Sequence, residues 1–333
     1  MRAYERLLNY VKVWTTSDEE STTSPTTARQ FDLAKLLLEE MKGMGIEDAM
    51  MDEYGYVYGH IPATPGYENC TAIGFLAHMD TAPDYSGENV NPQIIENYDG
   101  KDVVLGTSGR TLTVKDFPSL KNMTGKTLIT TDGTTLLGAD DKAGIAEIMT
   151  VVEELLKGDI PHGNVCLAFT TDEEVGSGAC HMDLERFGAP YAYTVDGGPE
   201  GEIQFENFNA ASAEFVIHGV NVHPGEAKDI MVNSMKIAME LQGMLPEQEA
   251  PEHTEGYEGF FHLMEMNGSV EETTMSYLIR EFDAEKYEAR KVLMQEITAK
   301  INAKYGEGTV ELKLEDSYRN MREMIEPCMQ LID

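Results

Sequence analysis

The sequence LGADDKAG at residues 137–144 joins an apolar segment to the start of a helix. Apolar residues at helical spacing follow it: Ile145, Ile148, Val152 and Leu155 or Leu156. An aspartate at a helix start accepts hydrogen bonds from free backbone N–H groups and suits the positive end of the helix dipole. Capping alone therefore explains Asp140, and a chemical role needs support from elsewhere in the chain.

That support comes from three other stretches in which acidic or histidine side chains follow apolar segments. Continuous apolar runs at residues 71–77, 164–170 and 191–195 are typical of strands covered on both faces. The side chains that follow them are His78 and Asp80, then Asp172, Glu173 and Glu174, and finally Asp196. Alternating strands and helices imply an α/β fold with a mainly parallel sheet covered by helices, where ligands bind beyond the carboxyl ends of the strands. We therefore expect these side chains and Asp140 to meet at one edge, with the stretch before Asp140 behaving as a further strand.

The length of 333 residues suggests two domains. We expect a catalytic domain over residues 1–206, an inserted α+β domain over 207–316, and a return into the first domain at 317–333. The net charge of −34 argues against nucleic acids and anionic membrane surfaces as partners. Without a signal peptide or a membrane-length apolar run, the sequence predicts a cytoplasmic protein with reduced thiols.

The pattern of the inserted domain predicts the order β-α-β-β-α-β, a small two-layer unit. The expected strands cover residues 211–219, 257–266, 271–282 and 308–315, and the expected helices cover 226–244 and a segment capped by Asp283. The sequence Asn267-Gly268 favours a tight hairpin turn between the second and third strands. A last helix is expected over residues 321–332.

The acidic clusters carry chemistry only if they converge. His78 and Asp80 are two residues apart, so both can point to one face, and a neutral imidazole is a good zinc ligand. Taken singly, a loop histidine, a solvated acidic turn and a capping Asp196 remain adequate explanations. Together, so many carboxylates are hard to ionise without cations between them. Two divalent ions about 3.5–4 Å apart would neutralise them, and Asp140 is our choice for the bridging carboxylate.

Four motifs resemble the signatures of the dizinc exopeptidase family, which includes glutamate carboxypeptidase and aminoacylase. They are HMDTAPD at residues 78–84, LGADDKAG at 137–144, FTTDEEVGSG at 169–178 and VDGG at 195–198. The segments DYSGENVNP at 84–92 and DGTT at 132–135 resemble the tripeptide aminopeptidases of that family. The resemblance implies a zinc-exopeptidase fold with an inserted lid domain, and hydrolysis of the N-terminal residue of short peptides.

The resemblance also implies a role for each site residue. Two zinc ions are expected, with His78 and Asp196 holding one, Glu174 holding the other, and Asp140 bridging them. Asp80 would orient His78. Glu173 would act as general base toward the attacking water and then pass the proton to the leaving amine.

Two residues of the inserted domain are expected to contact substrate. His223 would stabilise the oxyanion, and Arg280 would bind a substrate carboxylate, because guanidinium pairs with that group in bidentate geometry. A turn histidine and a strand-face arginine in a surface ion pair are the alternatives. Whether the inserted domain forms a homodimer is left open.

One departure from the family concerns the second zinc, whose final histidine ligand comes from the closing part of the catalytic domain. The last histidine here is His262, within the inserted domain. We therefore expect a chain lacking its C-terminal part, with an incomplete second zinc site and weak or absent activity. The alternatives are an N-acyl amino acid amidohydrolase of the same fold and a truncated, non-catalytic metal-binding chain. The native metal also stays open among zinc, cobalt and manganese, because carboxylate-rich sites accept several divalent ions.

Overall fold

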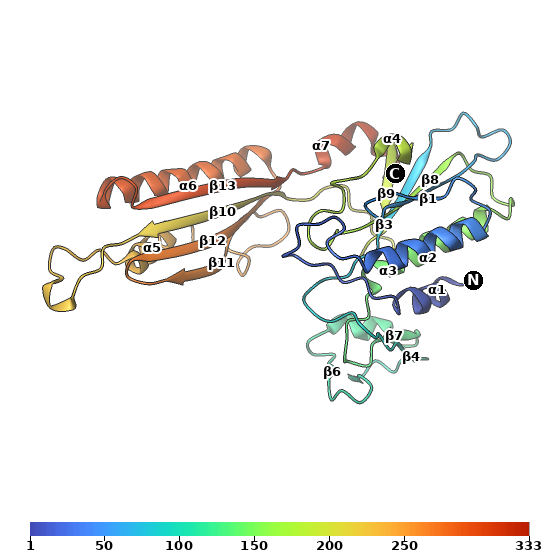
Figure 1. Ribbon diagram of the computed structural model, residues 1–333, viewed down its shortest axis with the longest axis horizontal. Coiled ribbons are helices and arrows are strands. Elements are labelled where there is room, and N and C mark those ends of the chain that lie inside the picture. Colours follow the sequence, from blue (N-terminus) through green and yellow to red (C-terminus); the bar gives the residue numbers. More distant parts are fainter. Residues whose placement is uncertain (333) are drawn as a thin grey trace. The chain divides into compact units, whose positions relative to one another are not determined.

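A computed structural model describes residues 1–332 and divides the chain into two compact units between Pro199 and Glu200 (Figure 1). The boundary expected from the sequence lies after residue 206 and stays a prediction. Among the described residues, no helix combines the length and the apolar character that crossing a bilayer requires.

The first unit is built on a five-stranded sheet with the order β1-β2-β8-β3-β9. Its strands are β1 (Met50–Met51), β2 (Val57–Ile61), β8 (Val165–Thr170), β3 (Ile73–His78) and β9 (Tyr191–Thr194). The strand β3 runs parallel to both of its neighbours, β8 and β9, whereas β2 is antiparallel to β1 and to β8. The parallel strands are the three apolar runs of the sequence, so their carboxyl ends share one edge, as expected.

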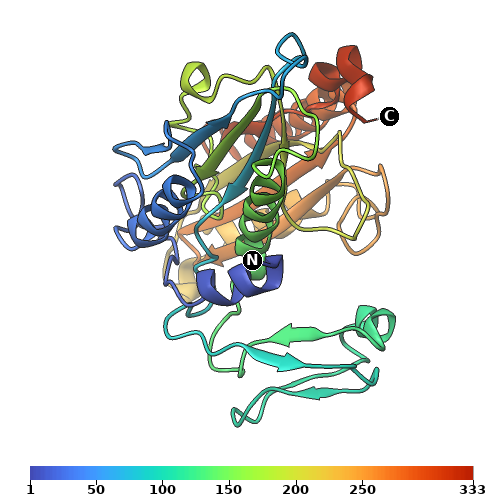
Figure 2. The ribbon, with the colours of Figure 1, turned by 90° about the vertical axis from the view of Figure 1, so that its right-hand side faces the viewer.

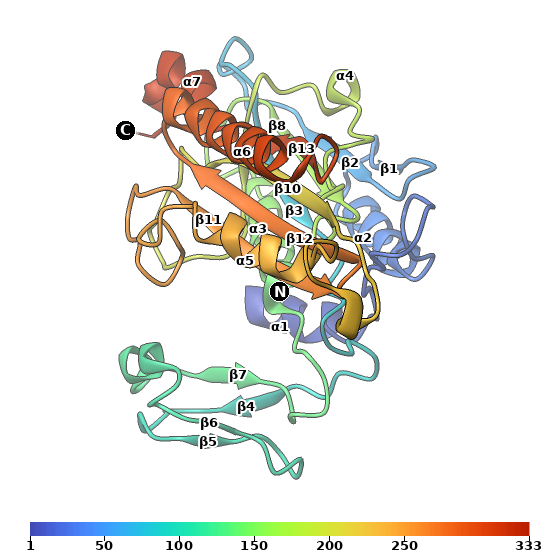
Figure 3. The same cartoon turned by 90° about the vertical axis from the view of Figure 1, so that its left-hand side faces the viewer.

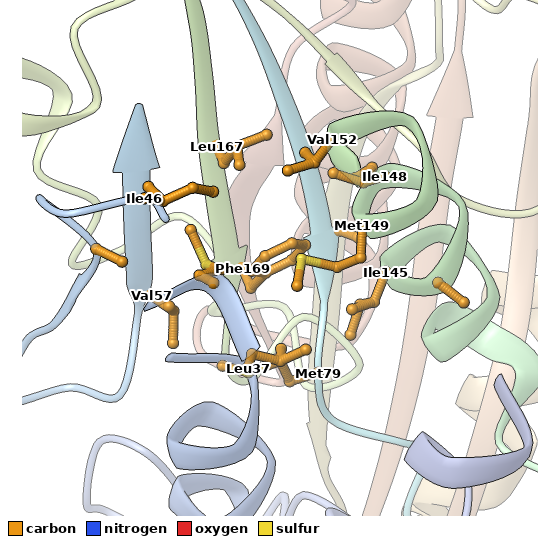
Figure 4. Close-up of a cluster of buried hydrophobic side chains, with 14 of the residues drawn as sticks. Leu37, Ile46, Val57, Met79, Ile145, Ile148, Met149, Val152, Leu167 and Phe169 are labelled. Carbon is orange, nitrogen blue, oxygen red and sulfur yellow. The ribbon is translucent and has the colours of Figure 1, made fainter. Parts of the chain in front are cut away.

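Helices cover both faces of this sheet (Figure 2). The helices α1 (Ala3–Tyr10), α2 (Gln30–Gly43) and α3 (Ala139–Leu155) pack on one face, and the short α4 (Leu184–Phe187) packs on the other. Successive side chains of β8 point to opposite faces of the sheet. Leu167 and Phe169 pack in the core formed with α1–α3, and Cys166 and Ala168 pack with Phe187 on the other face. Figure 4 shows the apolar side of α3 directed at Leu167 and Phe169. Burial of both faces explains why these strands are continuous apolar runs.

The stretch before Asp140 is not a strand of this sheet, and that expectation is wrong. β7 (Leu128–Thr130) pairs instead with β4 (Gln93–Ile95) in a separate two-stranded sheet (Figure 3). A second small sheet, of β5 (Val103–Val104) and β6 (Thr111–Leu112), and the 3-10 helix η1 (Pro118–Met123) complete this excursion around its own apolar cluster. Asp140 is therefore carried into place by a loop.

The second unit has the expected order β-α-β-β-α-β, and Figure 3 shows its two long helices over one face of an antiparallel sheet. The sheet order is β11-β12-β10-β13. Its strands are β10 (Asn209–His218), β11 (Phe260–Gly268), β12 (Glu272–Glu281) and β13 (Val310–Tyr318), and its long helices are α5 (Ser234–Gln242) and α6 (Ala284–Tyr305). Asp283 caps α6 as expected, accepting a hydrogen bond from the N–H of Lys286.

Three boundaries in this unit differ from the sequence expectations. Asn267 and Gly268 still pair with β12, so the hairpin turn lies at residues 269–271. The helix α5 begins only after Asn233, whose side chain caps it; the short 3-10 helix η2 (Pro224–Glu226) precedes it. The expected last helix is split into α7 (Arg322–Ile325) and the 3-10 helix η3 (Glu326–Leu331), since Pro327 lacks the N–H that a continuous helix needs.

Gly144 lies where α3 approaches the chain just after β9 closely. A Cβ atom at Gly144 would overlap the carbonyl oxygen of Val195, which immediately precedes Asp196. Gly144→Ala should therefore lower the free energy of unfolding by roughly 1–3 kcal/mol, measured by urea denaturation. The matched control is Gly43→Ala at the end of α2, where a Cβ atom meets nothing within 4 Å. It should be neutral or stabilising by up to about 1 kcal/mol, and equal losses in both variants would contradict the close approach.

Candidate metal centre

His78 is the last residue of β3 and the central donor of the site. Its Nδ1 lies 3.1 Å from the backbone oxygen of Asp80, which suits an N–H donor at that position. The opposite nitrogen, Nε2, lies 2.9 Å from Asp140 Oδ1, 3.6 Å from Asp196 Oδ2 and 3.8 Å from Glu173 Oε2. The ring thus presents one nitrogen to a group of carboxylates, as a histidine ligand does when its other nitrogen is fixed.

Two sets of side chains around this nitrogen could each hold a metal ion. One set is His78, Glu173 and Asp196, and the other is His78, Asp140 and Glu174, with the ligand atoms of each set within 4.8 Å of one another. The structure therefore brings together all four ligands expected from the sequence, and Glu173 joins them. Imidazole nitrogen and carboxylate oxygen are donors that zinc accepts, so the residues fit a divalent metal.

Burial and strong interactions between the charged groups of this cluster shift their pKa values. Burial alone would lower the pKa of His78, but the neighbouring carboxylates of Asp80, Asp141 and Asp196 raise it to about 10. Burial raises the pKa of Glu174, and the carboxylate of Asp140 raises it further. The pKa of Asp196 is raised by burial as well. A divalent cation would remove the repulsion that these shifts reflect.

Asp80 holds the β3 and β8 ends together. Its side chain is 0% exposed, and its two carboxylate oxygens accept hydrogen bonds from the backbone N–H groups of Glu173 and Glu174, at 3.0 and 3.2 Å. The expected role of Asp80 is to orient His78. Its carboxylate Oδ1 does lie 3.4 Å from His78 Nδ1, although the closer contact of the ring is with the Asp80 backbone oxygen.

Asp141, to which the sequence analysis gives no role, holds α3 against β3. It is buried, and its carboxylate accepts hydrogen bonds from the N–H groups of His78, at 3.2 Å, and Gly144, at 3.1 Å. The bond from Gly144 makes Asp141, and not Asp140, the aspartate that caps the helix. Both aspartates have non-helical backbone angles, so Asp140 precedes the regular helix and its 65%-exposed side chain points into the site. Two adjacent aspartates mark this position in the sequence, but their adjacency alone does not show which of the two faces the metal cluster.

Two further buried polar residues beside the site were also missed. Lys142 is buried on the first turn of α3, donates to the carbonyl oxygen of Val13 at 2.8 Å, and has its pKa lowered to about 7 by burial. Asp172 precedes the Glu173–Glu174 pair and is buried against the segment that leads into α2. An acidic run and a lysine on a helix look solvated in a sequence, because burial depends on distant segments.

The two residues expected to contact substrate lie in the second unit. His223 is exposed at the start of η2, and its Nδ1 accepts a hydrogen bond from the N–H of Gly225 at 3.1 Å. Arg280 lies on β12, donates to the backbone oxygen of Ile279 at 2.9 Å and has its guanidinium carbon 5.5 Å from the centroid of the Tyr318 ring. Their roles stay predictions.

Known families match two overlapping parts of the chain. The family described as "Peptidase dimerisation domain" matches residues 205–309. The family described as "M42 glutamyl aminopeptidase" matches residues 124–253.

Curated relatives match nearly the whole chain. "Peptidase T" of Clostridium novyi is 55% identical over 98% of this chain and 81% of its own length. "Peptidase T" of Geobacillus thermodenitrificans is 56% identical over 99% of this chain and 80% of its own length.

Solved structures share the fold. An aminopeptidase PepT from Bacillus cereus has a TM-score of 0.73 at 23% identity, covering 99% of this chain and 82% of that one. A tripeptidase from Staphylococcus aureus has a TM-score of 0.72 at 22% identity, covering 96% of this chain and 76% of that one. A dinuclear metal-binding peptidase of the M20 family from Bacillus subtilis has a TM-score of 0.59 at 14% identity, covering 96% and 75%.

Asp80→Asn should weaken zinc binding, because the amide cannot accept from both N–H groups that Asp80 joins. We expect a loss of roughly 10- to 100-fold in affinity, as for other residues that support metal ligands. Competition with a chromophoric chelator measures it. Asp84→Asn, at an exposed aspartate of the following loop, is the control and should bind zinc normally.

Zinc affinity should rise with pH. The carboxylates around His78 raise its pKa to about 10, so below that pH a metal ion that binds Nε2 must displace the second ring proton. Release of one proton per ion corresponds to an increase in affinity of roughly tenfold per pH unit below the pKa. Chelator competition between pH 6 and pH 9 tests this, and a flat profile would show that His78 is not a ligand.

Proposed function

The chain belongs to the peptidase T family, and we propose that it is a metal-dependent aminopeptidase that removes the N-terminal residue from tripeptides. The observation that carries the proposal is the convergence of four carboxylates on His78, three of which have an oxygen within 3.8 Å of its Nε2 atom. The names of the relatives and of the aminopeptidase and tripeptidase structures support the substrate class.

We propose zinc as the metal and assign its ligands from the chain's own donors. His78 and Asp196 would hold one ion, Glu174 the other, and Asp140 would lie between them. When bound, such ions supply an activated water and polarise the carbonyl of the scissile bond. Cobalt and manganese would suit the same carboxylate-rich donors.

Glu173 is the residue that we propose to move the proton. Its side chain is 51% exposed, and its Oε2 lies 3.8 Å from His78 Nε2, so the carboxylate reaches both the ligand cluster and solvent. The bond from its N–H to Asp80 fixes its backbone. Glu173 would accept the proton of the attacking water and deliver it to the amine that leaves.

The second metal site is proposed to be the weaker one in this chain. Both possible ligand sets include His78, whose Nδ1 is directed at the Asp80 backbone. A single remaining nitrogen binds one ion, so the other ion would rely on carboxylates. This supports the expectation of an incomplete second site.

The second unit is proposed to form a homodimer, which the description of the family matching residues 205–309 supports. His223 and Arg280 are proposed to contact the oxyanion and a substrate carboxylate, respectively. A cytoplasmic location also remains a proposal.

Glu173→Gln should slow hydrolysis strongly while leaving zinc content unchanged, because the amide cannot take the proton. We expect kcat for a tripeptide to fall roughly 10²- to 10⁴-fold, measured by release of the N-terminal amino acid. Glu185→Gln, at an exposed glutamate of α4, is the matched control and should keep normal turnover.

The substrate panel for this assay separates the competing functions. Cleavage of a tripeptide but not of its N-acetylated form or of N-acetyl amino acids supports the aminopeptidase. The reverse preference supports the amidohydrolase. A wild-type chain that binds zinc and hydrolyses none of them is the non-catalytic alternative.

A further inference from the structure

Asp172 adopts an unusual backbone conformation directly before Glu173 and Glu174. It lies two residues beyond the end of β8, directly before Glu173, and its φ is +60°. Left-handed backbone is uncommon for residues other than glycine, and aspartate and asparagine tolerate it best. Its side chain is only 2% exposed, although it begins a run of three acids. A buried carboxylate in this conformation must be held by specific partners.

Those partners come from the segment that leads into α2. Both carboxylate oxygens of Asp172 accept from the N–H of Thr26, at 3.0 and 2.9 Å. Oδ1 also accepts from Thr26 Oγ1 and from Gln30 Nε2, each at 2.6 Å. Gln30 completes the exchange, because its Oε1 accepts from the Asp172 N–H at 3.1 Å. The bonds from Thr26 and from Gln30 Nε2 all end on carboxylate oxygens of Asp172, so the carboxylate and not merely its shape is needed.

The turn that Asp172 begins carries both functional glutamates. The carbonyl oxygen of Asp172 accepts from the N–H of Ser177 at 2.8 Å, and that of Glu173 accepts from Gly176 at 2.7 Å. Asp80 holds the N–H groups of Glu173 and Glu174. The turn is thus fixed at its start by Asp172 and along its length by Asp80.

We propose that Asp172 is a positioning residue for Glu173 and Glu174, and that Thr26 and Gln30 are its anchors. Asp172 does not face the metal cluster; it sets the direction in which the chain leaves β8 and so aims the two glutamates at the site. The inference rests on the proposed function, since it assigns an orienting role to the residue before the general base.

The test is Asp172→Asn, which keeps the size of the side chain and its tolerance of left-handed backbone. The new amide nitrogen must face the donors of Thr26 or Gln30, so the turn should shift. We expect kcat for a tripeptide to fall about 10- to 100-fold with KM changed by less than about threefold, as for other residues that act through a metal ligand. The visible absorption spectrum of the Co²⁺-loaded protein, which reports ligand geometry without turnover, should change as well.

A compensating variant separates positioning from general damage. In Asp172→Asn combined with Gln30→Glu, the asparagine amide can donate to the new carboxylate, and its oxygen can still accept from Thr26. This swap keeps the total charge of the pair, so kcat and the Co²⁺ spectrum should return toward wild type, as coupled contacts require. Gln30→Glu alone places two carboxylates together and should be more harmful than the double variant.

Asp183→Asn provides the matched structural control. Asp183 also uses its carboxylate to hold a backbone N–H, that of Arg186 at 2.9 Å, but it caps α4. It should lower the thermal midpoint without altering the Co²⁺ spectrum or kcat.

The outcomes distinguish this inference from the function on which it rests. A wild-type chain that binds Co²⁺ but hydrolyses no peptide contradicts the proposed activity, and the spectra of the variants still decide the role of Asp172. A spectrum and kcat that are unchanged in Asp172→Asn, or a swap that restores neither, would overturn the positioning role alone. A wild-type chain that binds no Co²⁺ would overturn both.

Discussion

Negative charge gathered around one imidazole nitrogen is the constraint that shapes the first unit. Asp140, Glu173, Glu174 and Asp196 direct their oxygens toward His78 and one another. The protein supplies one ring nitrogen for them. The raised pKa values of Glu174 and Asp196 show that burial and neighbouring carboxylates resist their ionisation, and the raised pKa of His78 shows that the same carboxylates favour its protonated form. Such a cluster is stable only where the backbone holds the carboxylates in place and a cation can neutralise them.

The backbone is fixed by a second layer of acids that are buried more deeply. Asp80 joins the loop after β3 to that after β8, and Asp141 joins the start of α3 to β3. Asp172 joins the β8 turn to the segment before α2. Each carboxylate accepts from a backbone N–H group of a segment far from it in the sequence. The inner acids thus hold the loops, which leaves the outer acids free to face a metal ion and substrate.

The sequence predicts the outer acids well and the inner ones poorly. Apolar runs that end in acids identify the strand ends, since buried parallel strands must be apolar and their carboxyl ends share an edge. The residues next to each acid in the sequence do not distinguish Asp140 from Asp141, or Asp172 from Glu173. Which carboxylate of each pair is buried depends on N–H groups that lie far away in the chain. Asp140 was expected to follow a sheet strand, yet β7 pairs outside the main sheet, and only the tertiary fold brings its loop to the cluster. For the same reason the sequence suggests that Lys142 is solvated, whereas it is buried and donates a hydrogen bond to the carbonyl oxygen of Val13.

The segment between α1 and α2 shows how residues without catalytic chemistry can support a site. Lys142 donates to the carbonyl oxygen of Val13, and Thr16 pairs with Thr81, the residue after Asp80. Thr26 binds Asp172 from the same segment. Three segments that carry metal-site residues are therefore each bonded to the stretch at positions 13–26, which contains no member of the two candidate ligand sets. Because loops that meet at a sheet edge have little regular structure of their own to hold them, a shared support explains how their relative positions are kept while the outer carboxylates repel one another.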